Sequence, residues 1–203
     1  MPKNKISKNW INKQKRDLYV RQSKKEGYRS RAVFKLKEMD EKYKILKNGI
    51  SLIDLGAAPG SWSQYAARKI KNGKILSIDN QYMEKIENTF QIKGNFTDIG
   101  YQNKIKNYFK NKVDVILSDM AANTTGNKYI DSTSTGELCI SAIEFAREIL
   151  NSNGIFVSKI FMGASFNDII KEAKNTFKEI RIYKPQASRK ESKENYIICK
   201  NIL

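Results

Sequence analysis

The sequence predicts a single-domain α/β fold in which helices cover both faces of a mostly parallel sheet. From residue 50 onward, short runs that are apolar on both faces alternate with helical patterns, as in buried parallel strands. The chain has 203 residues, of which 40% are hydrophobic, enough for one domain with a sizeable core. Residues 1–29 are expected to form a basic, helical N-terminal extension, and residues 30–203 the folded domain.

Seven apolar runs define the expected strands. They are ISLIDL, KILSID, TFQIKG, DVILSD, GIFVSKIF, EIRIYK and NYIICK, which begin at residues 50, 74, 89, 114, 154, 179 and 195. The last two are separated by PQASRKESKE, which is too short for a helical crossover, so they should pair antiparallel. Helical spacing predicts helices over 30–46, 61–70, 102–110, 133–150 and 166–177, with Ser30 as the cap of the first.

The net charge of +17 is concentrated at the N-terminus. Residues 1–35 hold twelve Lys or Arg and only two acids, which accounts for ten of these charges. This asymmetry favours a polyanionic partner such as nucleic acid, because each neutralised phosphate releases a counterion; the alternative is a lysine-rich solvated surface. A basic start is also compatible with the remnant of an organelle-targeting segment, so the compartment stays open between cytoplasm and organelle.

Several classes of chemistry are disfavoured by composition. The chain has no histidine and only two distant cysteines, Cys139 and Cys199. A hydrolase triad lacks its base, and neither a disulfide framework nor a metal site is expected. No apolar run approaches the roughly 18 residues of a membrane span. A reducing compartment and no membrane partner are the resulting expectations.

The segment IDLGAAPGSWSQYAA, residues 53–67, is the strongest candidate ligand turn. It has no Lys or Arg between residues 54 and 67, and its glycines, Gly56 and Gly60, are spaced unlike either phosphate-binding motif. Asp54, Asp79 and Asp119 each close a predicted strand, and ligands in such sheets bind at that edge. A cationic ligand with a ribose fits best, which points to S-adenosylmethionine, with Asp79 on the ribose hydroxyls. A tight turn that binds nothing is the alternative.

Taken in order, five blocks carry a resemblance to a known family. SRAVFKL, IDLGAAPGSWSQ, SDMA, SKIF and ASRKESKENYI resemble the FtsJ/RrmJ-type ribosomal RNA 2′-O-methyltransferases over residues 17–200. The resemblance implies a Rossmann-like methyltransferase sandwich that moves a methyl group from S-adenosylmethionine to a ribose 2′-hydroxyl, leaving S-adenosylhomocysteine. The implied acceptor is a uridine of large-subunit ribosomal RNA, free or in a ribosomal particle. The implied catalytic residues are Lys35, Asp119, Lys159 and Glu194.

Two further sets of residues are expected at the site. The expected cofactor-binding residues are Asp54, Gly56, Ala57, Pro59, Gly60, Ser61, Trp62, Asp79, Asn95 and Asp119. The expected RNA-binding residues are Lys13, Lys15, Arg16, Lys24, Lys25, Arg29, Arg31, Arg189, Lys190 and Lys193. The chain departs from the family at Asn95, where relatives have an acid, and at Ala122, where they have proline. An amide oxygen still accepts a hydrogen bond from an adenine amine, so binding should be retained but weaker.

The reaction needs a base that withdraws the proton of the 2′-hydroxyl, and without histidine a lysine is the candidate. Lysine has an ordinary pKa of about 10.4 and needs burial or a neighbouring cation to approach neutrality. Lys159 lies in the apolar strand IFVSKIF and Lys35 in AVFKL, while Asp119 and Glu194 would orient the base. Snorkelling of each lysine to solvent is the alternative.

Two other functions remain open from the sequence, and a third is disfavoured. A tRNA 2′-O-methyltransferase of the same fold is the nearest, and a non-catalytic RNA-binding protein on this scaffold is a second, for which Asn95 is the only support. A nicotinamide oxidoreductase is disfavoured by the acidic turn. The expected partner is RNA, and the chain is expected to act as a monomer.

Overall fold

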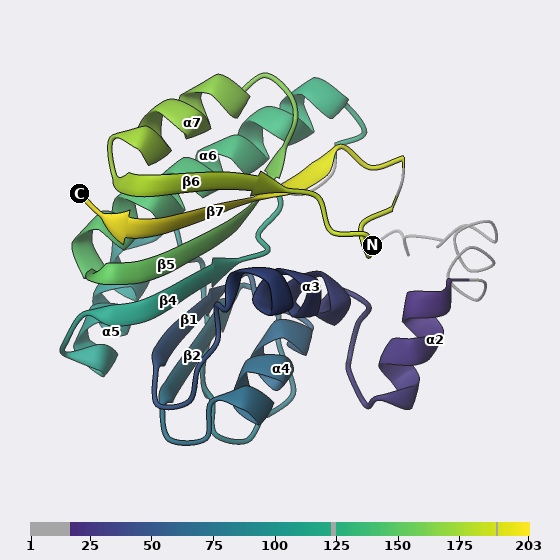
Figure 1. The fold of residues 1–203 in the computed structure, drawn as a ribbon, viewed down its shortest axis with the longest axis vertical. Helices are drawn as coiled ribbons and strands as arrows, with labels where there is room; N and C mark the ends of the chain where they lie inside the picture. Colours follow the sequence, from purple (N-terminus) through teal and green to yellow (C-terminus); the bar gives the residue numbers. More distant parts are fainter. Residues whose placement is uncertain (1–16, 123–124, 190) are drawn as a thin grey trace, which may run out of the picture.

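The computed structural model describes residues 17–122, 125–189 and 191–203. The architecture predicted from the sequence is confirmed: the chain forms one α/β domain built on a seven-stranded sheet (Figure 1). The strands are β1 (Ser51–Leu55), β2 (Lys74–Asp79), β3 (Phe90–Lys93), β4 (Val113–Ser118), β5 (Leu150–Phe161), β6 (Phe177–Tyr183) and β7 (Glu194–Ile202). The helices are α2 (Leu18–Lys25), α3 (Val33–Tyr43), α4 (Ser61–Lys69), α5 (Ile99–Phe109), α6 (Lys128–Ile149) and α7 (Phe166–Lys174).

The sheet order is β3-β2-β1-β4-β5-β7-β6, and β7 runs antiparallel to both of its neighbours. The other pairings are parallel, so β1, β2, β4 and β5 all end at one edge. The strand order reverses at β1, where β2 lies on one side and β4 on the other. Ligands of open α/β sheets bind at such a switch point.

Helices cover both faces of the sheet (Figure 1). α5, α6 and α7 contribute to one buried apolar cluster, and α3 and α4 to the other. Successive strand residues alternate between the two clusters, as in Leu52 and Ile53, because side chains of a strand point to opposite faces. In the described ranges no helix is long and apolar enough to cross a membrane.

The described part of the N-terminal extension is helical and lies against α3. Asp17 caps α2 through the backbone N–H of Tyr19, whose ring packs 5.4 Å from that of Phe34. Tyr28 is buried in the same apolar cluster as α3 and α4. These contacts place α2 against the start of α3, rather than as a free arm.

The predicted cap of the first domain helix is wrong. α3 begins at Val33, and the residue before it, Ala32, makes no side-chain cap. The hydroxyl of Ser30 lies 2.8 Å from that of Ser61 at the start of α4 instead. Asn127, which starts α6 earlier than predicted, does cap its helix through the N–H groups of Tyr129 and Ile130.

Candidate active site

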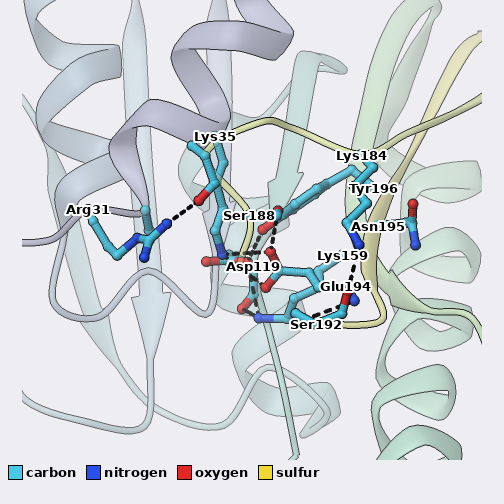
Figure 2. Close-up of polar contacts among 12 residues, drawn as sticks. Arg31, Lys35, Asp119, Lys159, Lys184, Ser188, Ser192, Glu194, Asn195 and Tyr196 are labelled. Carbon is cyan, nitrogen blue, oxygen red and sulfur yellow. Dashed lines mark hydrogen bonds and ion pairs between the residues drawn. The ribbon is translucent and has the colours of Figure 1, made fainter. Parts of the chain in front are cut away.

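Lys159 and Asp119 form the centre of the site (Figure 2). Lys159 lies on β5, and its side chain is 9% exposed. Its Nζ donates to the backbone carbonyl of Asp119 at 2.6 Å and to Oδ1 of the same residue at 3.0 Å. Asp119 directly follows β4, which pairs with β5, so the sheet register brings the two residues together. Two bonds from one residue fix the position of the amine.

Lys35 and Glu194 form a second ion pair beside the first. Nζ of Lys35, on α3, lies 2.8 Å and 2.9 Å from the two carboxylate oxygens of Glu194, at the start of β7. The hydroxyl of Ser188 donates to the same carboxylate at 2.8 Å. The four residues predicted as catalytic therefore lie together, with each lysine on one carboxylate.

Tyr196 joins the two pairs and was not predicted. It lies opposite Lys159 in the β5–β7 register and is fully buried. Its hydroxyl donates to Oδ1 of Asp119 at 2.8 Å, and its ring lies 5.8 Å from Nζ of Lys35. Burial raises the pKa of Tyr196 well above its usual value, and the charges of Asp119 and Glu194 add to the effect. Tyr196 is therefore a permanent hydrogen-bond donor near neutral pH.

Asp119 is held in its ionised form. Burial acts to raise its pKa, but the charges of Lys159 and Lys35 and the bonds from Tyr196 and Lys159 outweigh it and lower the pKa below the usual value. A carboxylate that accepts from a lysine and a tyrosine at one oxygen is a fixed anchor rather than a proton shuttle. Its second oxygen leaves acceptor capacity for a ligand.

The turn after β1 needs glycine at two positions. Gly56 has φ +70°, and a Cβ there would lie 2.6 Å from Cγ of Met120. Gly60 has φ +108°, and a Cβ would lie 2.8 Å from both Nη1 of Arg29 and Cδ1 of Ile86. Any other residue would be strained and would push these neighbours away.

A pocket of about 210 Å³ opens beside this turn. Four residues predicted to bind the cofactor line it: Gly56, Asp79, Asn95 and Asp119. Unpredicted lining residues are Asn80, Gln81, Phe96 and Met120. The carboxylate of Asp79 accepts the N–H of Ala58 at 2.9 Å and that of Gln81 at 2.8 Å, one on each oxygen. It keeps a free lone pair on each oxygen for two further donors.

The other predicted cofactor residues do not line this pocket. Ala57, Pro59, Gly60 and Ser61 belong to the turn and the first residue of α4, whereas the indole of Trp62 is buried and donates to the carbonyl of Ala32 at 2.8 Å. The Trp62 ring packs 5.7 Å from that of Tyr196. In this structure Trp62 supports the active-site tyrosine rather than reaching the pocket.

Asp54 lies beneath the turn. It is the fourth residue of β1, not the last, and is fully buried. Oδ2 accepts from Ser63 at 2.5 Å, while among the described residues Oδ1 has no partner. Burial raises the pKa of Asp54 to about 7; the bond from Ser63 opposes this, and the charges of Asp119 and Asp79 reinforce it. The carboxyl group supports the turn from inside and does not reach the pocket.

Comparison with known proteins identifies the family to which the chain belongs. The model of one protein family, described as FtsJ-like methyltransferase, matches residues 28–202. The chain belongs to the FtsJ-like methyltransferase family. That match spans the turn, the pocket and all four residues of the paired lysines and acids, so the site belongs to the part of the chain that defines the family.

Relatives of this FtsJ-like methyltransferase come from several distant organisms. It is 63% identical to the ribosomal RNA large subunit methyltransferase E of Pelagibacter ubique, over 98% of both chains. It is 45% identical to the protein of the same name from Methanosarcina mazei, over 93% of this chain and 70% of that one. A crystal structure described as a Plasmodium falciparum ribosomal RNA methyltransferase is 34% identical, with a TM-score of 0.78 over 87% of this chain and 99% of that chain.

The residues predicted to bind RNA fall into three groups in this FtsJ-like methyltransferase. Lys13, Lys15, Arg16 and Lys190 lie outside the described residues. Lys24, Lys25 and Lys193 are exposed, and Arg189 is half-buried. The third group, Arg29 and Arg31, makes contacts within the protein.

Arg29 ties the N-terminal extension to the cofactor turn. Its guanidinium donates to the carbonyl of Pro59 at 3.0 Å, to that of Glu84 at 3.0 Å and to that of Lys85 at 3.1 Å. Its backbone N–H donates to the side chain of Gln64 on α4 at 3.0 Å. Arg31 is used similarly: it pairs with Asp17 and donates to the carbonyl of Ala187. These partners lie far away in sequence, so no local pattern could have revealed them.

Proposed function

We propose that this protein transfers a methyl group from S-adenosylmethionine to the 2′-hydroxyl of a ribose in RNA, a uridine of large-subunit ribosomal RNA being the acceptor. The names of the relatives support the ribosomal RNA substrate. The observation that carries the chemistry is the amine of Lys159, which donates two hydrogen bonds to Asp119, a residue that lines the pocket.

The pocket fits S-adenosylmethionine in charge and in hydrogen bonding. Its described lining includes two acids, Asp79 and Asp119, and no basic residue, which suits a sulfonium cation. The free lone pairs of Asp79 suit the two ribose hydroxyls, and Asn95, which is exposed on the rim, offers an amide oxygen to the adenine amine. When bound, this group supplies an electrophilic methyl carbon.

The chain's own residues then perform the proton chemistry. The ammonium group of Lys159 first releases a proton to solvent, and the free amine then takes the proton of the 2′-hydroxyl as the oxygen attacks the methyl carbon. Asp119 fixes the orientation of the amine because it accepts a hydrogen bond from it. Tyr196 in turn holds the carboxylate of Asp119 in place by donating to it. Lys35 pairs with Glu194 and lies 5.8 Å from the ring of Tyr196, where it can bind a ribose or phosphate oxygen.

Substitution of Lys159 tests the proposal. Lys159→Ala should abolish methyl transfer and leave S-adenosylhomocysteine binding intact. Lys159→Arg should also fail, because a guanidinium keeps its charge but cannot lose its proton near neutral pH. Single-turnover transfer of labelled methyl groups to ribosomal RNA measures both. Near-normal activity of Lys159→Arg would show that another group takes the proton.

Mapping of 2′-O-methylation at nucleotide resolution identifies the acceptor. Cells that lack the protein should lose one mark in large-subunit ribosomal RNA. Loss of a mark from tRNA instead would favour the alternative acceptor, and loss of none would favour a non-catalytic RNA-binding protein. The monomeric state remains a prediction, which a sedimentation measurement addresses. The same methylation assay on naked RNA and on ribosomal particles distinguishes these two substrates.

A further inference from the structure

A second hollow lies beside the cofactor pocket, on the other side of the loop that follows β4. Its volume is about 500 Å³, and Ala121 lines both hollows, so this loop is their shared wall. The other walls come from the start of α6, the end of β5 with the turn after it, and the segment before β7. The lining residues used below are Tyr129, Ser132, Phe161, Met162 and Lys193.

The hollow lies next to the proposed catalytic residues, at the end of β5. Phe161 follows Lys159 by two positions on β5, so both side chains leave the strand on the same side. Phe161 pairs with Glu194 in the sheet, and the N–H of Met162 donates to the carbonyl of Lys193 at 3.2 Å. A ribose whose 2′-hydroxyl reached Lys159 would therefore have this hollow next to it, on the side away from the cofactor.

The walls suit a flat, largely apolar group with a polar edge. Tyr129 and Met162 are 69% and 43% exposed, which leaves an aromatic ring and a thioether free to contact a ligand. Among the described residues the buried hydroxyl of Ser132 has no hydrogen-bond partner, although buried polar atoms nearly always have one. The hydroxyl both donates and accepts, and base edges present both kinds of group.

The charged residues around the hollow favour an uncharged base inside it and a phosphate group outside it. Two acids, Asp131 and Glu191, line the hollow. Asp131 accepts from the N–H and the hydroxyl of Thr125, and these bonds lower its pKa, so it remains an anion. A phosphate would be repelled there, whereas an uncharged base would not. Lys193, exposed beside Glu194, is the lining residue placed to meet a phosphate outside the hollow.

We propose that this hollow binds the base of the nucleotide that is methylated, with Ser132 bonded to the edge of the base and Tyr129 against its face. This inference rests on the proposed function, because it places the acceptor ribose at Lys159. Sequence-specific RNA recognition commonly targets unstacked bases, which stack on aromatic side chains and are hydrogen-bonded along their edges. The hollow would thus orient the ribose and fix which hydroxyl meets the amine.

Removal of the base from the RNA, combined with substitution of the hollow, tests the proposal. The substrates are two synthetic RNAs around the mapped methylation site, one intact and one with an abasic ribose at the acceptor position. The variants are Ser132→Ala and Tyr129→Ala, and Ser134→Ala is the matched control, because it lies on the same helix but lines a different cleft. Single-turnover kcat/KM is measured for each pair.

With intact RNA, Ser132→Ala and Tyr129→Ala should each lower kcat/KM about tenfold, as expected for loss of one hydrogen bond or one stacking contact. With abasic RNA the wild type should itself be slow, and both variants should match it. Ser134→Ala should behave as wild type, and S-adenosylhomocysteine affinity, measured by calorimetry, should not change in any variant.

Two results would overturn the inference while leaving the proposed function standing. One is wild-type activity that is equal on intact and abasic RNA. The other is a loss in the variants that is equally large on both RNAs, which would mean that these side chains act without touching the base. If the wild type methylates no RNA at all, the proposed function itself fails.

Discussion

Replacement of Asp54 by asparagine should flatten the pH dependence of folding stability between pH 5 and pH 8. Asp54 is fully buried, and burial raises the pKa of its carboxyl group from 3.8 to about 7, against the hydrogen bond from Ser63 and with the help of the charges of Asp119 and Asp79. The folded state therefore holds a proton that the unfolded chain releases near pH 4. Its stabilising effect is complete below about pH 4 and is lost as the pH rises to about 7.

The magnitude follows from the two pKa values. A rise from 3.8 to about 7 corresponds to a total of about 4 kcal/mol, of which roughly 2.5 kcal/mol lies between pH 5 and pH 8. The chain has no histidine, so no imidazole titrates in this interval and obscures the effect. Asparagine keeps an acceptor for the hydroxyl of Ser63 and cannot ionise.

Urea denaturation of both proteins at several pH values measures the effect. Relative to wild type, Asp54→Asn should gain about 2.5 kcal/mol in the free energy of unfolding from pH 5 to pH 8. Asp168→Asn is the control: this carboxylate is exposed in the first turn of α7, and the substitution should displace the stability curve without changing its shape. Parallel curves for Asp54→Asn and wild type would show that the buried group is already ionised at pH 5, and would refute the reasoning from burial.

Three further predictions concern ligand binding. Asn95→Asp should tighten S-adenosylhomocysteine binding about threefold to tenfold, because a carboxylate accepts a stronger hydrogen bond from the adenine amine; calorimetry that shows equal or weaker binding would contradict this placement. Joint replacement of the exposed Lys24 and Lys25 by glutamine should weaken RNA binding and lower the slope of log affinity against log salt by up to about 2, while cofactor affinity stays the same; an unchanged slope would leave these lysines as solvated charges. Arg29→Gln should weaken S-adenosylhomocysteine binding several-fold, because the carbonyl of Pro59 in the turn after β1 and those of Glu84 and Lys85 between β2 and β3 lose their donor; an effect on RNA affinity alone would instead make Arg29 an RNA contact.

The sequence predicts the fold well because its signal is local and repeated. Each strand is a short apolar run between helical patterns, and the ten residues between the last two runs exclude a crossover. The residues proposed as catalytic follow from the resemblance together with one unusual feature, a lysine within an apolar strand. Both observations can be made from a single sequence, without knowing which side chains contact these residues in the fold.

The unpredicted parts of the site depend on contacts between distant segments. Tyr196 follows Glu194 by two positions in a strand, so the sequence could have predicted that both side chains lie on the same side of the sheet. An aromatic residue in an apolar run usually serves packing, however, and gives no sign of a role in the site. Arg29 has the composition of an RNA contact, and only the folded chain brings it to the carbonyl of Pro59. The cap predicted at Ser30 is wrong because α3 begins only at Val33; the Ser30 hydroxyl accepts the N–H of Ala32 and lies 2.8 Å from the hydroxyl of Ser61.

The position of β7 between β5 and β6 fixes the order in which the enzyme is completed during synthesis. β6 is made before β7, but its backbone pairs with the sheet only through β7, so its strand hydrogen bonds cannot form until residues 194–202 emerge. Glu194 and Tyr196 lie on that last strand, and they hold Lys35 and Asp119. A nascent chain that ends before residue 194 has the cofactor turn but lacks both, and it exposes the edge of β5, which favours aggregation. Closure of the sheet and completion of the catalytic set are a single event.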